Sequence, residues 1–349
     1  MSKLSKNRFL QTHSGPQKRP VNSLLDAMKD GREYESLIDV VPQNFNARDE
    51  FRRAIADIET ATKRPLIVYA ANVVKPASWS STDIGYADDL PFSEMVSTVP
   101  ASTSAIDILI VTPGGLAQQV SQFVNKVRPR FTDVSMIIPY MAMSAGTIWA
   151  LSGNKIWMDE RAFIGPIDPQ VPGKDGRYVP AQAILALLKK IQDSGQGNIS
   201  KGQNPDWSDM MILQNMDAKE IVNAISLSKY SIQLAVEYLT AHKFRDWSNH
   251  DSDGRPVTPD ERATRAAEVA EKLCSHDLWK VHSHGISRDV AWRELRIKIE
   301  HPEDLPGMHK ALRRFWALMY WIFEATSTAK IFISDQYSLF KTKVELTQS

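Results

Sequence analysis

The sequence predicts an α/β protein with a largely parallel sheet. Apolar stretches at 106–111, 134–139 and 155–158 have the length and composition of buried strands. Segments with helical patterning, 116–127 and 147–151, separate them. Alternation of strands and helices along a chain is typical of a parallel sheet covered by helices.

The part that precedes this unit is predicted to be a tail followed by helices. Residues 1–20 are basic and polar and are expected to form a flexible tail. Residues 21–64 carry apolar side chains at three- and four-residue spacings, which indicates an N-terminal helical segment. Residues 66–70 are a short apolar strand after Pro65, and the polar residues 71–90 are expected to form a loop over one end of the sheet.

The part that follows this unit is predicted to be mostly helical. The order expected is a turn-rich loop at 171–178, a helix from Pro180 to about Ile191, a loop at 192–207, a helical region at 208–242, a polar loop at 246–258 and a helix at 259–275. We therefore expect one catalytic domain over 65–300 and a C-terminal helical extension over 301–349.

The last predicted helix, after Pro306, is rich in aromatic residues. These are Phe315, Trp316, Tyr320, Trp321 and Phe323. Their spacing predicts a stripe that is buried or faces another subunit, and we favour a subunit interface.

Composition narrows the class of protein. With 42 Lys and Arg against 41 Asp and Glu, the net charge of +1 does not favour a nucleic-acid partner. The single cysteine, Cys274, excludes an intrachain disulfide and suits a reducing cytoplasm. The N-terminus lacks the apolar core of a secretory signal, and the apolar run 315–323 is shorter than the ~20 residues that span a bilayer. We expect a soluble, cytoplasmic protein with no stable membrane span.

Two turns at strand ends predict acyl-transfer chemistry. The strand at 106–111 runs into Thr112-Pro113-Gly114-Gly115, and the strand at 134–139 is soon followed by a small-residue turn around Ser144. Backbone N–H groups of Gly114, Gly115 and Ala145 are candidates for an oxyanion hole, and Ser144 is the candidate nucleophile. Sites in parallel sheets gather at these carboxyl ends. The alternatives are an ordinary turn at 113–115 and a serine that only caps the helix after it.

These segments resemble the serine dehydrogenase proteinase family of the Clp protease/crotonase superfamily, relatives of signal peptide peptidase A. The resemblance rests on TPGG at 112–115, MSAGT at 143–147 and IGPIDPQ at 164–170, with a weaker likeness in LWKVHSHGIS at 278–287. It implies a Clp/crotonase-like spiral of β-β-α units with a largely parallel sheet and, in this chain, added C-terminal helices. It also implies a serine endopeptidase that acts on peptides or proteins without a cofactor and assembles into a homo-oligomer.

The resemblance further implies a triad in the chain order Ser, Asp, His. Asp168 is the candidate acid, although an Asp before Pro169 also suits a turn, and Asp159 is a poorer candidate. No histidine occurs between His13 and His242, so a histidine base must come from the C-terminal third. His282, with His284 close behind, is the candidate base; on an extended segment the two would face the same side.

Several alternatives stay open. A Ser-Lys dyad, as in signal peptide peptidase A, would use Lys189 or Lys190, although these lysines also suit a solvated helix end. A crotonase-like acyl-CoA enzyme would use the same oxyanion hole on a thioester, and a non-catalytic oligomeric scaffold would use none of it. His276, His282 and His284 also raise a metal site, which the lack of a nearby ligand pattern disfavours.

Overall fold

The computed structural model describes residues 19–43, 45–75, 82–173, 177–250 and 253–342. The predicted tail, 1–20, lies outside the described residues except for its last two positions. Parts of the predicted loops at 71–90, 171–178 and 246–258 lie outside them as well.

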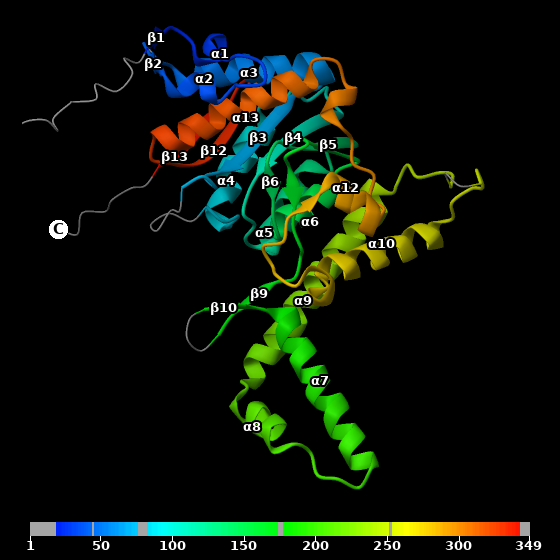
Figure 1. Cartoon of the computed structure of the whole chain (residues 1–349). Helices are drawn as coiled ribbons and strands as arrows, with labels where there is room; N and C mark the ends of the chain where they lie inside the picture. Colours follow the sequence, from blue (N-terminus) through cyan, green and yellow to red (C-terminus); the bar gives the residue numbers. More distant parts are fainter. Residues whose placement is uncertain (1–18, 44, 76–81, 174–176, 251–252, 343–349) are drawn as a thin grey trace, which may run out of the picture.

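A six-stranded sheet forms the centre of the molecule (Figure 1). Four of its strands are parallel and correspond to the predicted strands, so the expected α/β class is confirmed. In spatial order the strands are β13 (Ser338–Thr342), β12 (Thr328–Ser334), β3 (Leu66–Ala71), β4 (Ala105–Val111), β5 (Asp133–Ile138) and β7 (Lys155–Met158).

Both faces of this sheet are covered, which explains why its strands are apolar throughout. The side chains of β3 alternate between the two faces of the sheet, because successive residues of a strand point in opposite directions. Leu66 and Val68 pack with the helices α3 (Ala47–Thr62) and α13 (Met308–Ala325). Tyr69 packs on the other side, with α4 (Asp89–Ser97), α5 (Ala117–Val127) and α6 (Ala145–Leu151).

A second, smaller sheet lies beyond the carboxyl ends of the main strands. Its order is β11 (Ile286–Ser287), β8 (Phe163–Ile164) and β6 (Met141–Ala142), with β8 parallel to β6 and antiparallel to β11. This sheet joins three segments that are far apart in the sequence, and it positions the candidate site described below.

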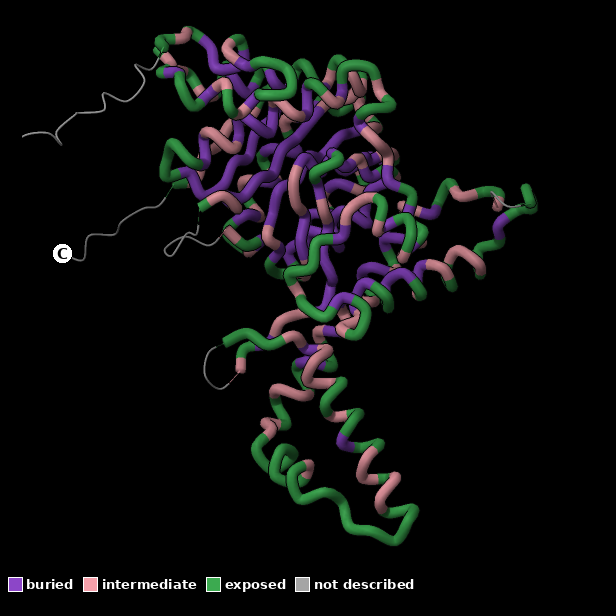
Figure 2. The backbone as a smooth tube through the Cα atoms, in the orientation of Figure 1, coloured by how far each residue is buried: buried purple, intermediate pink, exposed green. Residues whose placement is uncertain are grey.

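A helical arm extends away from the sheets. It consists of β9 (Gln170–Pro172), β10 (Tyr178–Pro180), α7 (Ala181–Ser200), α8 (Trp207–Asn215) and α9 (Ala218–Tyr238). Figure 2 shows that the outer part of the arm is mostly exposed. The loop predicted to start at 192 was wrong at its beginning, because α7 continues through Gly195 and Gly197 to Ser200. The helical region predicted at 208–242 is interrupted at Met216-Asp217, where Asp217 caps α9.

The remaining elements flank these units. They are β1 (Arg19–Val21), α1 (Leu24–Ala27), α2 (Glu35–Ile38), β2 (Val40–Pro42), η1 (Tyr86–Asp88), η2 (Leu239–Lys243), α10 (Pro259–Cys274), α11 (His276–Trp279), α12 (Arg288–Val290), η3 (Ala291–Leu295) and η4 (Pro302–Asp304). The predicted start of α10 is confirmed, since Thr258 and Glu261 form a capping box ahead of it. No helix among the described residues is long and apolar enough to cross a membrane.

The C-terminal region is not helical throughout. After α13, β12 pairs antiparallel with β3 and thereby joins the central sheet, a pairing that the periodicity of a single strand does not reveal. The aromatic stripe of α13 is covered largely from within the chain. Phe315 contacts Phe51, Trp316 stacks on Tyr140 and Tyr320 meets Tyr34. Those contacts account for the stripe without a second subunit.

Candidate active site

Ser144 occupies a strained turn between β6 and α6. Its φ of 50° and ψ of −116° lie in a region that non-glycine residues rarely adopt. Ser144 is the N-cap residue of α6, but its hydroxyl makes no capping hydrogen bond. The side chain is half-buried, and a sharp strand-to-helix turn of this kind holds a nucleophile clear of its own backbone.

The glycine turn lies directly against Ser144. Gly114 has a φ of +111°, and a Cβ placed on it would be 2.9 Å from both Ser144 Cβ and the Met143 carbonyl oxygen. Gly115 has a φ of +137°, and a Cβ there would lie 2.4 Å from the Ile84 backbone nitrogen. Both positions therefore require glycine, one for the approach to Ser144 and one for the approach to Ile84.

Two backbone N–H groups in these turns are available to a ligand. The Gly114 N–H donates to Thr112 Oγ1 at 3.1 Å and is already satisfied. Within the described ranges, the N–H groups of Gly115 and Ala145 donate to no protein acceptor. Ala145 is the first residue of α6, where N–H groups lack partners within the helix. Gly115 and Ala145 thus suit an anionic oxygen better than Gly114 does.

One row of paired residues brings the four sequence motifs together. Thr112 bridges Ala142, Ala142 pairs with Ile164, and Ile164 pairs with Ile286. Paired strands lie about 4.8 Å apart, so the row holds four distant segments side by side. Ser144 follows the row on one segment, Asp168 follows it on a second, and His282 precedes it on a third.

Asp168 and His282 form a hydrogen-bonded pair. His282 Nδ1 lies 2.8 Å from Asp168 Oδ1, and the histidine side chain is 19% exposed. The Asp168 residue is 1% exposed, and its second oxygen, Oδ2, is buried without a partner. The contact orders the imidazole with Nδ1 as the donor and leaves Nε2 as the proton acceptor.

The surroundings of Asp168 come from two helices. The Ile167 N–H donates to Leu273 O near the end of α10, and the Ala181 N–H at the start of α7 donates to Pro169 O. Burial, with a smaller contribution from the charge of Asp168, raises the pKa of the Cys274 thiol to about 12. Cys274 therefore stays protonated near neutral pH and is a structural thiol.

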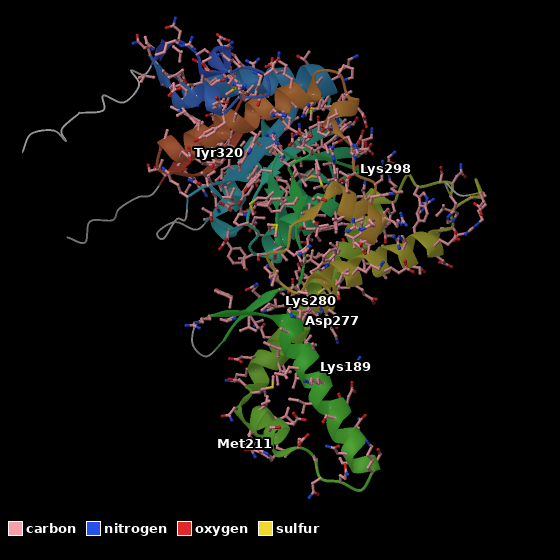
Figure 3. The ribbon with its side chains drawn as sticks, in the orientation of Figure 1. Lys189, Met211, Asp277, Lys280, Lys298 and Tyr320 are labelled. Atoms are coloured by element: carbon pink, nitrogen blue, oxygen red, sulfur yellow. The ribbon has the colours of Figure 1, made fainter. Side chains whose placement is uncertain are left out.

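The other candidate residues lie elsewhere. His284 is exposed and its ring lies 5.3 Å from that of Trp279. The expected extended segment is instead a turn, closed by a hydrogen bond from His284 N to Val281 O, so positions 282 and 284 do not share one side. Lys189 and Lys190 are exposed on α7, and Figure 3 shows Lys189 out on the arm. Asp159 is occupied by an ion pair with Arg161 at 2.7 Å.

Two threonines that the sequence reasoning did not single out support the site. Thr147 Oγ1 accepts a hydrogen bond from the Gly165 N–H at 2.9 Å and lies 2.8 Å from the Ala142 carbonyl oxygen. It thereby ties the helix after Ser144 to the segment that leads to Asp168. Thr112 holds the Gly114 N–H, as described above. Thr112 lies in the TPGG segment and Thr147 in the MSAGT segment, so these motifs could have indicated both threonines.

Within the part of the chain that the structure describes, no group of three or more His, Cys, Asp or Glu residues could hold a metal ion. The Ser144 hydroxyl also makes no hydrogen bond to His282 within the described ranges. The arrangement therefore contains a strained serine turn, a carboxylate–imidazole pair and two free N–H groups, brought to one row of a small sheet.

The central sheet and the serine turn beside the glycine turn agree with the α/β fold that the motifs predict. Residues 94–202 match the family model for ClpP-like SDH-type serine proteinases, and this match confirms the resemblance stated from the motifs.

Two relatives come from Methanocaldococcus jannaschii. The uncharacterized protein MJ0137 is 31% identical over 47% of this chain and 53% of its own length. The uncharacterized protein MJ1495 is 39% identical over 24% of this chain and 28% of its own length. The chain thus spans about half the length, or less, of the curated relatives it matches.

Two solved structures show a low similarity. A membrane-bound stomatin-specific protease, 1510-N, aligns with a TM-score of 0.36 and 16% identity, over 62% of this chain and 74% of that chain. ClpP1 of Listeria monocytogenes aligns with a TM-score of 0.24 and 14% identity, over 49% of this chain and 92% of that chain. Similarities at this level say nothing about mechanism.

Proposed function

We propose that this chain is a serine peptidase that hydrolyses peptide bonds with a Ser144–His282–Asp168 triad. The observation that carries the proposal is the row Thr112–Ala142–Ile164–Ile286, which gathers the serine, the acid, the histidine and the glycine turn from four separate segments. The family match of residues 94–202 supports the same chemistry.

In the proposed reaction, Ser144 Oγ attacks the carbonyl carbon of the peptide bond. His282 Nε2 takes the hydroxyl proton and gives it to the leaving amine as the C–N bond breaks. Water then attacks the acyl-enzyme, with His282 Nε2 accepting its proton and returning it to Ser144 Oγ as the ester bond breaks. Asp168 holds the imidazole through Nδ1 and stabilises the imidazolium that forms. The N–H groups of Gly115 and Ala145 stabilise the negative oxygen of the tetrahedral intermediate, because both are free and preorganised.

Ser144 and His282 are not hydrogen-bonded in the structure, so a conformational change must bring them into contact before attack. The segments that carry the two residues pair with opposite edges of the same strand, β8, so their backbones are held in one small sheet. Contacts between catalytic groups commonly tighten when substrate binds. We propose that a peptide occupying the turn around Ser144 brings His282 Nε2 into reach.

The lysine dyad is less well supported. Lys189 and Lys190 are exposed on the arm, where nothing desolvates their ammonium groups to make either a base. The strained turn at Ser144 favours a nucleophile over a crotonase-like site or a scaffold, because such strain persists mainly where function uses it.

A homo-oligomer, a cytoplasmic location and the domain division at 65 and 300 remain predictions.

Labelling with a fluorophosphonate probe tests the proposal. The unmodified chain and Ser283→Ala, a matched serine in the histidine turn, should be labelled, whereas Ser144→Ala should not. His282→Ala should lose most labelling and His284→Ala should keep it. Equal labelling of Ser144→Ala and the unmodified chain would refute the nucleophile. Hydrolysis of acyl-CoA thioesters without hydrolysis of peptides would assign the site to the crotonase-like alternative.

A further inference from the structure

A large cavity lies along the edge of the sheet, away from Ser144. Its volume is about 1050 Å3, and its walls include the starts of β5 and β7, the segment after η2, and residues from α12 to Glu300 and His301. None of Ser144, Asp168 and His282 lines it. In Figure 3, Lys298 on this cavity is well separated from Lys280, which is close in sequence to His282. A cavity of this size suits a small-molecule ligand.

The cavity is positively charged. Seven lysine or arginine side chains and four carboxylates line it, and the cations are Lys155, Lys243, Arg245, Arg265, Arg288, Arg296 and Lys298. Three of the carboxylates are already paired, Asp133 with Arg64 at 2.8 Å, Asp246 with Arg245 at 3.0 Å and Glu300 with Lys298 at 4.0 Å. In the described ranges, Lys155, Lys243 and Arg296 form no ion pair with a carboxylate, so these charges are available to a ligand.

The positive charges crowd one another. Burial first, and then the charges of Lys298 and Lys155 against the opposing charge of Glu300, lower the pKa of Lys243 to about 8. Burial first, and then the charges of Arg128 and Arg245, lower the pKa of His242 to about 4.

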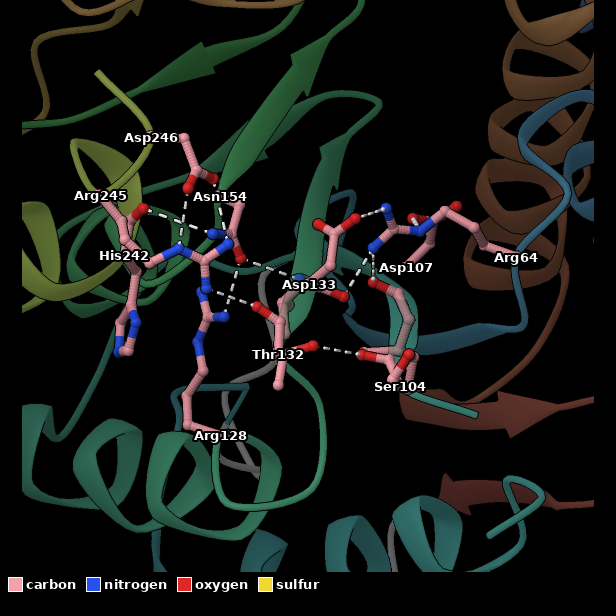
Figure 4. A network of polar contacts seen from close by, with 12 residues as sticks. Arg64, Ser104, Asp107, Arg128, Thr132, Asp133, Asn154, His242, Arg245 and Asp246 are labelled. Atoms are coloured by element: carbon pink, nitrogen blue, oxygen red, sulfur yellow. Dashed lines mark hydrogen bonds and ion pairs between the residues drawn. The ribbon is translucent and has the colours of Figure 1, made fainter. Parts of the chain in front are cut away.

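Figure 4 shows Arg128, Arg245 and the backbone of His242 near Asn154, and Asn154 and Arg245 line the cavity. Arg245 also lowers the pKa of Arg128, after burial, to about 10. A bound anion would relieve this repulsion.

An aromatic ring stands among these cations. Trp292 lines the cavity with 49% of its surface exposed, and the Arg296 guanidinium lies 5.6 Å from the centre of its ring. Phe244 and Trp247 also line the cavity. An exposed indole next to cationic side chains offers a stacking surface for a flat base, together with charge for the phosphates that accompany it.

We propose that this cavity binds a nucleoside polyphosphate. Lys155, Lys243 and Lys298 hold the phosphates, and Trp292 stacks on the base. Within the described ranges, multiple phosphates match Lys155 and Lys243, which have no carboxylate partner, together with Lys298, whose exposed ammonium is paired only with Glu300 at 4.0 Å. A base explains the exposed indole. The balanced charge of the whole chain, +1, favours a small ligand over an extended nucleic acid, which requires a continuous basic track. The proposal is independent of the peptidase chemistry proposed for Ser144.

Isothermal titration of the full chain at low salt tests the ligand class, with ATP, tripolyphosphate and adenosine as probes. We expect ATP to bind about tenfold more tightly than tripolyphosphate, because of base stacking. Adenosine should bind more weakly than both. Failure to detect ATP binding, or equal affinities for ATP and tripolyphosphate, would overturn the nucleoside assignment. An unstructured oligonucleotide that binds more than tenfold more tightly than ATP would instead indicate a nucleic-acid site.

Single substitutions test the residues. Lys155→Ala and Lys298→Ala, both at exposed positions that should not disturb folding, should each weaken ATP binding about tenfold. Trp292→Leu should abolish the preference for ATP over tripolyphosphate and leave tripolyphosphate binding unchanged. Lys229→Ala, a matched exposed lysine on α9, should change the affinity less than twofold. Unchanged ATP affinity in both cavity lysine variants would refute the site.

Discussion

Replacing Asp168 by Asn separates the catalytic role of this carboxylate from its effect on stability. One oxygen of Asp168 accepts from His282 Nδ1 at 2.8 Å, and the other is buried without a partner. An Asn of the same shape presents an amide that can force the imidazole into the wrong tautomer. In triads of this kind that change lowers the rate on the order of 10⁴-fold. We expect a similar loss for Asp168→Asn.

The same substitution should leave the free energy of unfolding almost unchanged. The charge-assisted hydrogen bond to His282 contributes about 1.5–3 kcal/mol, and its loss is destabilising. Replacing a buried carboxylate that lacks a second partner by a neutral amide recovers about 1–3 kcal/mol, because burying an amide costs less than burying a charge. Because these two effects have similar size and opposite sign, we expect a net change below about 1.5 kcal/mol.

The rate constant for fluorophosphonate labelling and the urea dependence of unfolding measure the two quantities. Asp159→Asn is the matched control, since Asp159 is equally buried but paired with Arg161. That control should lose about 1–3 kcal/mol of stability and keep its labelling rate. A labelling rate for Asp168→Asn within tenfold of the unmodified chain would refute the triad, whatever happens to stability.

Three further predictions follow from single contacts. Gly115→Ala should lower the labelling rate by at least 10²-fold, because a Cβ 2.4 Å from the Ile84 nitrogen displaces an oxyanion donor; a normal rate would place the hole elsewhere. Burial lowers the pKa of Lys243 to about 8 in the folded chain, against 10.5 in the unfolded chain. The buried charge therefore lowers the free energy of unfolding below pH 8, and this cost disappears above pH 10.5. Denaturant titrations should therefore show stability rising between these values, by at most about 3 kcal/mol, and Lys243→Met should abolish the rise. Lys330→Met should destabilise the chain by about 1–3 kcal/mol, because the buried Asp88 loses its partner at 2.6 Å and keeps Lys341 at 3.2 Å and the Tyr69 hydroxyl at 2.9 Å; calorimetry of Lys330→Met with Asp88→Asn should show most of the loss restored.

Much of the sheet could be predicted from local patterns. The strands at 66–70, 106–111, 134–139 and 155–158 are near-continuous apolar runs, as expected for strands buried on both faces, and each appears with boundaries shifted by one residue at most. The helix after Thr258 carries its own capping signals. By contrast, Gly195 and Gly197 misled the prediction for α7, because a glycine inside a helix costs only about 1 kcal/mol and the helix continues through both.

The last strands show the limit of such patterns. Residues 328–334 were assigned to a helical extension, yet β12 pairs antiparallel with β3 at the centre of the fold. Strand pairing joins residues far apart in the sequence, and one strand carries no mark of its partner. The same limit applies to the aromatic stripe of α13, whose contacts with Tyr34, Phe51 and Tyr140 depend on how distant helices and loops pack.

The sequence by itself determined the local chemistry of the candidate site. It placed a serine and two glycines at the ends of neighbouring strands, and the turn residues needed for those backbone angles are local properties. Only the tertiary structure decided which histidine meets Asp168. His282 and His284 have the same chemistry and nearly the same position in the chain, and the turn at 281–284 directs the first toward the carboxylate and leaves the second exposed beside Trp279. The pairing of Ile286 with Ile164 sets the position of this turn relative to Asp168. A hydrogen bond forms only where the fold brings a donor and an acceptor atom within about 3 Å of each other.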